Sequence, residues 1–283
     1  HMEMDLGLDS LGKIAMQCFI QENYGVNVTE RDFETYQNLR SFSAFVEKNR
    51  DTALEGALKK VSWADIINSS ANIELNKPHI FHFATISAIK NLTKLLYKVE
   101  YVGMDNIPEN TPVIIAPNHQ SYIDGVLAVG TLSKTQLYKT YFFAKIRSYI
   151  NGWFRKFVDK SNVIIMDIND NVKNSIGKLA KALKEDNSVV IFPEGTRTKD
   201  GDIAEFKSTF AIISKEMKIP VIPVCISGAF ENIKVGKTLP AFGSKIKVQF
   251  LRQMLPEETD TYESFANKVR NEIETVLNKE RNV

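Results

Sequence analysis

The chain has 283 residues, 43% of them hydrophobic, and a net charge of +2 at pH 7. This length and composition are enough for a buried core in each of two domains. No stretch approaches eighteen uncharged apolar residues, which excludes a helix that spans a bilayer. Cys18 and Cys225 lack the spacing of metal ligands, so we expect a reducing compartment, no disulfide framework and no metal.

The charge is distributed unevenly along the chain. Residues 1–57 contain five Lys and Arg against ten Asp and Glu, whereas the rest contains thirty-one against twenty-four. We therefore expect a small acidic domain over residues 1–50 and a larger basic domain over residues 79–283, with a linker over residues 51–78. The leading His1-Met2 resembles a cloning remnant, so we expect that the chain was cut from a longer one.

The first domain is predicted to be helical. A helix should follow the turn-like Gly-Leu-Asp-Ser of residues 7–10 and end at Gly25, because apolar residues recur at helical spacing. A second amphipathic helix is predicted around Phe42 and Val46. On pattern alone, Ser10 is a helix N-cap, a position that serine commonly occupies. The apolar face of the first helix consists of Leu11, Ile14, Ala15, Cys18 and Phe19.

The wording "LGLDSL", residues 6–11, resembles the acyl carrier protein family over about residues 3–50. The resemblance implies that Ser10 carries a phosphopantetheine group. The family has another helix and a long loop before this serine, whereas only nine residues precede it here. We therefore expect other protein to cover the apolar face of the first helix.

Residues 81–98 are predicted to form a basic amphipathic helix. Such a helix can lie in a membrane interface, or it can pack on its own domain with its lysines outward. The sequence leaves both readings open. One side of the helix holds Phe81, Thr85, Ala88, Ile89, Leu92 and Leu96, and the opposite side holds Lys90, Lys94 and Lys98.

In the second domain, strand-like runs alternate with helical patterns. This alternation predicts a layered α/β fold with a mostly parallel sheet, in which ligands bind beyond the carboxyl ends of strands. Asn118 and His119 follow one predicted strand, and Glu194 follows another. The predicted strands are 113–116, 141–144, 163–166, 189–192, 221–226 and 246–250, and the predicted helices are 126–132, 176–183 and 206–217.

His119 and Asp124 can form a base and its partner. A neutral imidazole can accept a proton from a hydroxyl at neutral pH, and a carboxylate on its other nitrogen fixes the tautomer. Five residues across a turn and a helix start can bring the two side chains together. The alternative is a capping network with Asp124 at the helix start.

A second motif, "FPEGTR", occupies residues 192–197. Gly195 allows close approach to the backbone, and the planar guanidinium of Arg197 suits bidentate capture of a phosphate. The alternative is a turn closed by an ion pair between Glu194 and Arg197.

"NHQSYID", residues 118–124, and "FPEGTR" together resemble the glycerophospholipid O-acyltransferase family of the 1-acylglycerol-3-phosphate acyltransferase type, and "KIPVIPV", residues 218–224, resembles its fourth block. The resemblance covers about residues 95–275. It implies acyl transfer from a thioester to a hydroxyl, with His119 as base and Asp124 as its partner. The residues implied to bind the acceptor are Asn118, Lys145, Arg147, Glu194, Gly195, Thr196 and Arg197.

Two positions depart from the family pattern. Arg147 stands where the family often has an acid, and Ile168 stands where an arginine usually follows the aspartate. One cation that faces the phosphate is therefore absent, and Lys145 with Arg147 can compensate for it. The departures leave a phosphate-free or amino acceptor open.

A thioester is already activated, so the transfer needs no cofactor, and direct transfer is favoured over an acyl-enzyme. We expect an acyl-carrier or acyl-CoA thioester as donor and a lysophospholipid or glycerol phosphate as acceptor, in phospholipid biosynthesis or remodelling. The enzyme is expected to be cytoplasmic, peripheral on the inner face of the membrane, without nucleic-acid partners and downstream of an acyl-activating domain. The alternative is a non-catalytic carrier or lipid-binding module.

Overall fold

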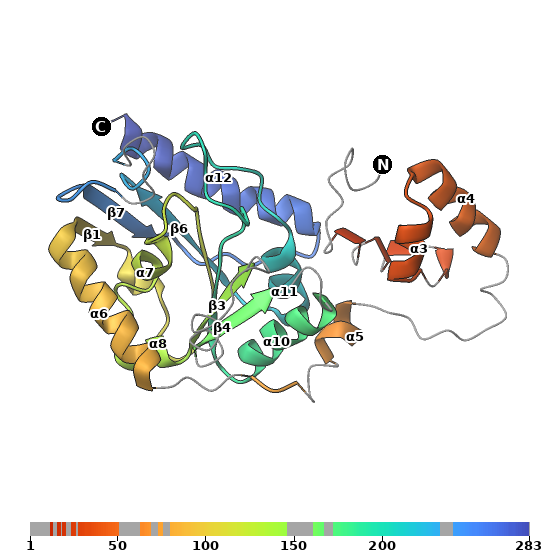
Figure 1. The fold of residues 1–283 in the computed structure, drawn as a ribbon, viewed down its shortest axis with the longest axis horizontal. Helices are drawn as coiled ribbons and strands as arrows, with labels where there is room; N and C mark the ends of the chain where they lie inside the picture. The colour runs from red at the N-terminus through yellow and green to blue at the C-terminus, as the bar shows by residue number, and fades with distance from the viewer. Residues whose placement is uncertain are drawn as a thin grey trace. The chain divides into compact units, whose positions relative to one another are not determined.

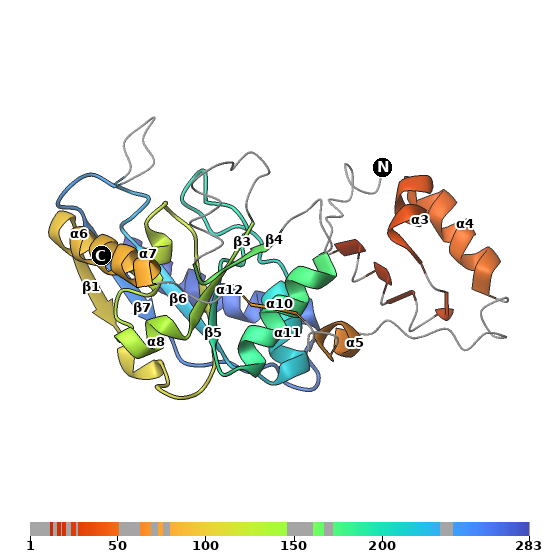
Figure 2. The same cartoon turned by 60° about the horizontal axis from the view of Figure 1, so that its bottom comes forward.

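A computed structural model of the protein describes residues 12–13, 16–17, 19–20, 24–26, 28–50, 63–68, 73–75, 80–145, 161–166, 172–232 and 240–282. The chain divides into two compact units, which are shown in Figures 1 and 2. The smaller unit contains residues 1–72 and 168–177, and the larger contains residues 73–167 and 178–283.

The smaller unit is helical in its described part. The described residues between Gly12 and Tyr24 are helical, and Gly25 has a positive φ of 70°, which fits the predicted helix end. The helices α3 (Glu30–Thr35), α4 (Leu39–Arg50) and α5 (Trp63–Asn68) follow. A small core joins α3 and α4 to the residues before them, and it includes the stacked rings of Phe33 and Phe42. Its buried members are Ile20, Val26, Val28, Phe33, Phe42 and Val46.

The larger unit is built on a seven-stranded sheet in the order β1-β7-β6-β2-β5-β3-β4. Neighbouring strands are parallel except for the antiparallel pair of β6 and β7. A mostly parallel sheet needs crossover connections, and the helices between the strands supply them. The strands are β1 (Lys98–Val102), β2 (Ile114–Pro117), β3 (Thr140–Lys145), β4 (Val163–Met166), β5 (Ser188–Ile191), β6 (Val221–Ser227) and β7 (Lys245–Phe250).

Helices cover both faces of this sheet. The helices α6, α7 and α8 lie on one face, and α11 and α12 lie on the other (Figures 1 and 2). The layered α/β architecture predicted from the sequence is therefore confirmed. The helices are α6 (Ile80–Leu96), α7 (Asp124–Ala128), α8 (Lys134–Tyr138), α10 (Val172–Lys184), α11 (Thr209–Met217) and α12 (Tyr262–Arg281), with a short 3₁₀ turn η2 (Met104–Asn106).

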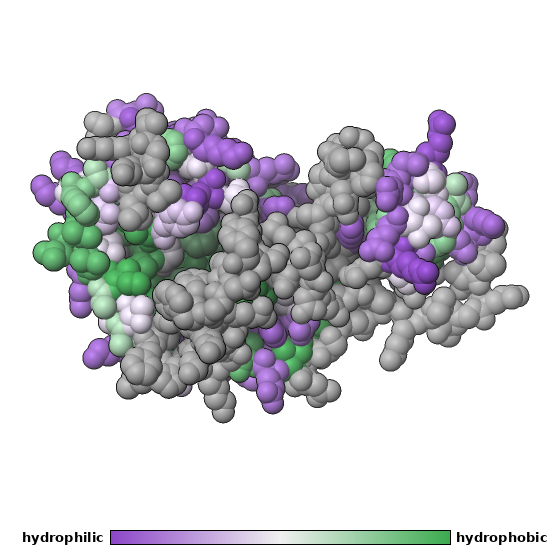
Figure 3. Space-filling model, in the orientation of Figure 1, coloured by the Kyte–Doolittle hydropathy of each residue, from purple (hydrophilic) through white to green (hydrophobic). Residues whose placement is uncertain are grey.

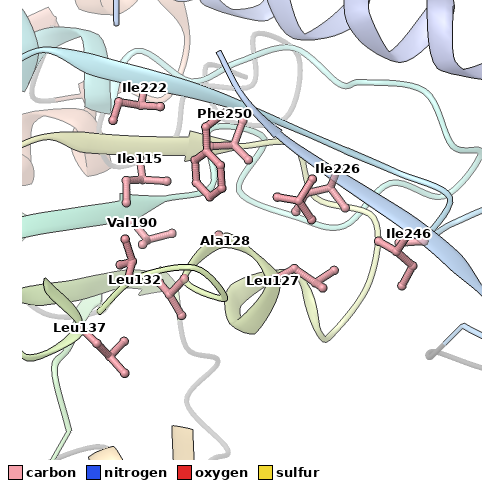
Figure 4. Close-up of a cluster of buried hydrophobic side chains, with 14 of the residues drawn as sticks. Ile115, Leu127, Ala128, Leu132, Leu137, Val190, Ile222, Ile226, Ile246 and Phe250 are labelled. Carbon is pink, nitrogen blue, oxygen red and sulfur yellow. The ribbon is translucent and has the colours of Figure 1, made fainter. Parts of the chain in front are cut away.

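One hydrophobic cluster of the larger unit lies between the sheet and α7. Figure 4 shows side chains of four neighbouring strands directed at Leu127 and Ala128 of α7. Both of these residues have no exposed surface. Since every residue of β2 and β6 is buried, the centre of the sheet is covered on both faces. The strand residues labelled there are Ile115, Val190, Ile222, Ile226, Ile246 and Phe250.

Helix α6 exposes much of the side that was predicted to be apolar. Phe83, Ile86 and Leu96 pack against the core, whereas Ile89 and Leu92 of the predicted apolar side are 36% and 51% exposed. Lys90 lies on the inner side, where its Nζ donates to the carbonyl of Leu132 at 3.1 Å and burial lowers its pKa. The predicted apolar side of the helix is therefore only partly packed against its own domain. Among the described helices, none is long and apolar enough to cross a membrane.

All six predicted strands are confirmed to within a residue or two. The edge strand β1 was not predicted, because its alternation of exposed and half-buried residues covers only five positions. The predicted helix 126–132 is shorter in the structure, where α7 ends at Ala128 and a turn precedes the unpredicted α8. Helix α12 was also not predicted, although its one buried face is regular.

Candidate active site

Two turns at the carboxyl ends of β2 and β5 form the candidate site. These strands are adjacent, parallel and central in the sheet. His119 follows β2 and Glu194 follows β5, so both turns leave the same edge of the sheet. This placement is the one that the alternation of strands and helices predicts.

The side chains of His119 and Asp124 are in contact. His119 Nδ1 lies 2.9 Å from Asp124 Oδ2, and Asp124 is completely buried at the start of α7. Because the carboxylate can only accept this hydrogen bond, Nδ1 carries the proton and Nε2 of the neutral ring has the free lone pair. The imidazole is 21% exposed, so solvent and substrate can reach it.

The carboxylate of Asp124 also organises the turn that carries the base. Oδ2 accepts the backbone N–H groups of Gln120 at 2.5 Å and Ser121 at 2.6 Å, and Oδ1 accepts the Ser121 hydroxyl at 2.5 Å. The capping network and the His119–Asp124 contact are therefore both present. A single carboxylate fixes the backbone of the turn and the orientation of the imidazole.

Glu194 links the turn after β5 to the turn after β2 by hydrogen bonds. Its Oε1 accepts the His119 N–H at 2.7 Å, and its Oε2 accepts the Ala204 N–H at 3.0 Å. The side chain is buried, and this burial raises the pKa of its carboxyl group while the two N–H donors oppose the rise. In the other direction, Thr198 N–H donates to the His119 carbonyl at 2.8 Å. Glu194 was expected to contact the acceptor, but its side chain is occupied in positioning His119.

Asn118 continues the sheet with its side chain. Its backbone N–H donates to Val224, and the next place in a parallel ladder belongs to its own carbonyl. The side chain takes that place, because Oδ1 accepts the Ile226 N–H at 2.7 Å and Nδ2 donates to the Ile226 carbonyl at 3.0 Å. Asn118 was expected to bind the acceptor. It is buried instead, and it lets the chain leave the sheet toward His119 without unpaired groups on Ile226.

The open part of the second turn presents glycine, threonine and two cations. Gly195 has a φ of +69°, and a Cβ built there would lie 3.4 Å from Lys207 Cε. Lys207 therefore passes directly over the turn, and the sequence did not single it out because its position depends on the loop that follows. Gly195 and Thr196 are exposed.

Arg197 stacks on Tyr122 and does not pair with Glu194. Its Cζ lies 3.6 Å from the centroid of the Tyr122 ring. Within the described part of the chain, no carboxylate forms an ion pair with this guanidinium. The alternative of a Glu194–Arg197 bridge is therefore wrong.

The remaining predicted residues are placed only in part. Lys145 ends β3, the neighbour of β5, so its backbone reaches the same edge of the sheet, and its side chain is not described. Arg147 and Ser10 lie outside the described residues. Phe192 also belongs to the site, because its ring lies 4.2 Å from the His119 ring. Phe192 is the first residue of the FPEGTR motif, but only the fold shows that its ring packs beside His119.

The site thus combines a histidine that is hydrogen-bonded to a buried carboxylate with an exposed turn beside two cations. Residues 98–227 match the family model described as Acyltransferase, and residues 2–46 match the model described as Phosphopantetheine attachment site. The chain therefore contains a segment similar to the acyltransferase family and, before it, a segment similar to a phosphopantetheine attachment site. Both resemblances drawn from the sequence are confirmed.

Named relatives support the same assignment. A chloroplast 1-acyl-sn-glycerol-3-phosphate acyltransferase of Brassica napus is 31% identical over 51% of this chain and 40% of its own length. The 1-acyl-sn-glycerol-3-phosphate acyltransferase of Bacillus subtilis is 29% identical over 50% of this chain and 69% of its own. The chain thus spans about two fifths of the chloroplast relative.

A solved structure shares the fold. The crystal structure of the 1-acyl-sn-glycerophosphate acyltransferase PlsC from Thermotoga maritima superposes with a TM-score of 0.57 and 22% identity. The match covers 77% of this chain and 87% of that one.

Proposed function

We propose that the larger unit transfers an acyl group from a thioester to the hydroxyl of a 1-acylglycerol 3-phosphate type of acceptor. The observation that carries the proposal is the contact of His119 with the buried Asp124 beside an open, cationic turn. The names of the relatives supply the acceptor class.

In the proposed step, His119 Nε2 accepts the proton of the acceptor hydroxyl as its oxygen attacks the thioester carbonyl. The C–O bond forms, the C–S bond breaks, and the imidazolium returns its proton to the departing thiolate. Asp124 stabilises the imidazolium while it exists. A general base of this kind contributes about 10²–10⁴-fold to the rate.

The acceptor's phosphate is proposed to bind at Gly195 and Thr196, between Arg197 and Lys207. Both cations lie at this turn. Because Ile168 stands where the family usually has an arginine, a second cation from elsewhere in the chain is needed to contact the phosphate. Lys207 fits this need, in addition to the predicted Lys145 and Arg147. A lysine presents a compact charge and an arginine a planar fork, so the two can hold different phosphate oxygens.

The donor is proposed to be an acyl thioester on phosphopantetheine, carried either by Ser10 or by coenzyme A. The match of residues 2–46 to a phosphopantetheine attachment site supports the first source. A tethered thioester has an effective concentration of the order of mM when its linker allows it to reach the site. The boundaries at residues 50 and 78 and the upstream acyl-activating domain remain predictions.

A peripheral position on the inner face of the membrane is also proposed, with α6 as the contact. Leu92 and Leu95 on its outer side are 51% and 81% exposed. Phe242 is 80% exposed in the loop that reaches the end of this helix, where Gly243 N–H donates to the Leu96 carbonyl at 2.7 Å. Figure 3 shows hydrophobic side chains gathered on this side of the larger unit. The helix can thus enter the headgroup region with its apolar side down. Residues 149–157 combine aromatic and basic side chains in a composition typical of a membrane interface, and they are proposed as a second contact. They lie outside the described residues.

Mass spectrometry of the lipid product tests the activity. The protein is incubated with acyl-CoA and, in parallel, lysophosphatidate, monoacylglycerol and a long-chain amine. We expect diacylglycerol phosphate from wild type and none from His119→Ala, which keeps the fold because the imidazole is partly exposed. Product from the amine or from monoacylglycerol in preference to lysophosphatidate would contradict the proposed acceptor, and equal turnover by His119→Ala would contradict the mechanism.

A further inference from the structure

The stacking of Arg197 on Tyr122 joins the two turns of the site. Tyr122 lies between His119 and Asp124, whereas Arg197 belongs to the turn after β5. The guanidinium carbon lies over the ring, 3.6 Å from its centroid. A guanidinium over an aromatic face is attracted by the negative charge of the π system.

The ring of Tyr122 lies at the surface and is not part of the hydrophobic core. It is 62% exposed, whereas Ser121 and Asp124 on either side of it are completely buried. The backbone is therefore fixed, and the ring is held out from it. The sequence assigned no task to Tyr122.

The backbone around Arg197 is fixed in the same way. Glu194 holds the turn from one side, and the hydrogen bond from Thr198 to the His119 carbonyl holds it from the other. The long side chain of Arg197 extends from this fixed backbone to the Tyr122 ring. The ring of Tyr122 is the aromatic partner that the structure describes for it.

We propose that Tyr122 is a positioning residue that holds the guanidinium of Arg197 ready for the acceptor's phosphate. This inference rests on the proposed function. One face of the guanidinium is occupied by the ring, so the N–H groups in its plane can donate to two phosphate oxygens. Because Tyr122 sits in the same turn as the base, the stacking fixes the distance between bound phosphate and His119. The aromatic face performs this task, and the phenol hydroxyl is not needed.

Three variants test the inference with lysophosphatidate and acyl-CoA as substrates. Tyr122→Leu should raise KM for lysophosphatidate about two- to thirtyfold, the range that the loss of a cation–π contact predicts, while kcat and KM for acyl-CoA stay within twofold. Tyr122→Phe should retain wild-type kinetics because it keeps the ring. Tyr262→Leu is the matched control. Tyr262 lies at the start of α12, and Lys215 Nζ is 6.0 Å from the centroid of its ring.

A double variant separates action through Arg197 from any other effect. In the Arg197→Ala background, Tyr122→Leu should change KM for lysophosphatidate by less than twofold, because the partner is already gone. Additive losses, a fall in kcat, or an equal rise in both KM values would overturn the role of Tyr122. Wild type that acylates no phosphate acceptor would instead refute the proposed function itself, which keeps the two failures distinguishable.

Discussion

At the scale of single residues, Asp124 has two roles. Its charge acts on the imidazole of His119, and its hydrogen bonds fix the shape of the turn. Asparagine can keep the shape, since its carbonyl can replace Oδ2 and its amide can donate to the Ser121 hydroxyl. We therefore expect Asp124→Asn to fold and to lose about 10²–10⁴-fold in kcat, because no carboxylate remains to stabilise the imidazolium. Steady-state kinetics and thermal melting check this.

Asp124→Ala is the contrast variant. It removes acceptors from two buried backbone N–H groups, and each unpaired group costs about 1–3 kcal/mol. A marked loss of stability is expected from alanine and only a small one from asparagine. Equal melting temperatures of the two variants would show that the network does not hold the turn.

Lys207 gives a second prediction at this scale. Lys207→Met keeps the length of the side chain over Gly195 and removes its charge. A lost charge-assisted hydrogen bond costs about 1.5–3 kcal/mol, so KM for lysophosphatidate should rise at least about tenfold. Lys199→Met, an exposed lysine in the same segment, should leave KM unchanged. If both variants behave alike, general surface charge and not a site contact attracts the acceptor.

At the scale of elements, α6 makes the membrane proposal specific. Leu92→Gln with Leu95→Gln removes apolar area from the outer side of the helix and leaves its packed side unchanged. We expect the double variant to lose binding to anionic vesicles in a flotation assay. Leu255→Gln is the matched control, because Leu255 is 55% exposed on another part of the unit. Retained flotation of the double variant would exclude α6 as the contact.

The same helix shows how far sequence patterns reach. A helical wheel separates an apolar side of α6 from a lysine side, but it does not say which side meets the protein. For the strands the pattern is sufficient. Residues 113–116 form an apolar, β-branched run, and such a strand is buried on both of its faces. The pairing of His119 with Asp124 was predictable because both lie in one short segment. The roles of Asn118 and Glu194 were not, since their partners, Ile226 and Ala204, come from other segments.

At the scale of the whole molecule, the two units have cores of very different size. A small helical core buries a small share of its surface and is marginally stable, whereas the core around the sheet is large. We expect two calorimetric transitions, of which the smaller unit gives the first. Activity with acyl-CoA as donor should persist until the second.

A matched pair of substitutions assigns these transitions. Phe42 and Phe250 are each 2% exposed, one in each core, and a buried Phe→Ala change costs about 3–5 kcal/mol. Phe42→Ala should lower only the first transition, and Phe250→Ala only the second. A single transition that shifts with both changes would mean that the units unfold as one.

The way in which Asn118 completes the ladder has a consequence for amide hydrogen exchange. The Ile226 amide proton is held by the side chain of Asn118, so its protection depends on one rotamer and not on a backbone pair. Exchange at Ile226 therefore reports how often the start of the turn that carries His119 opens, separately from global unfolding. In Asn118→Ala this amide should exchange much faster than that of Val190 in β5, whose strand remains paired on both sides. The opening rate of the turn can then be compared directly with turnover.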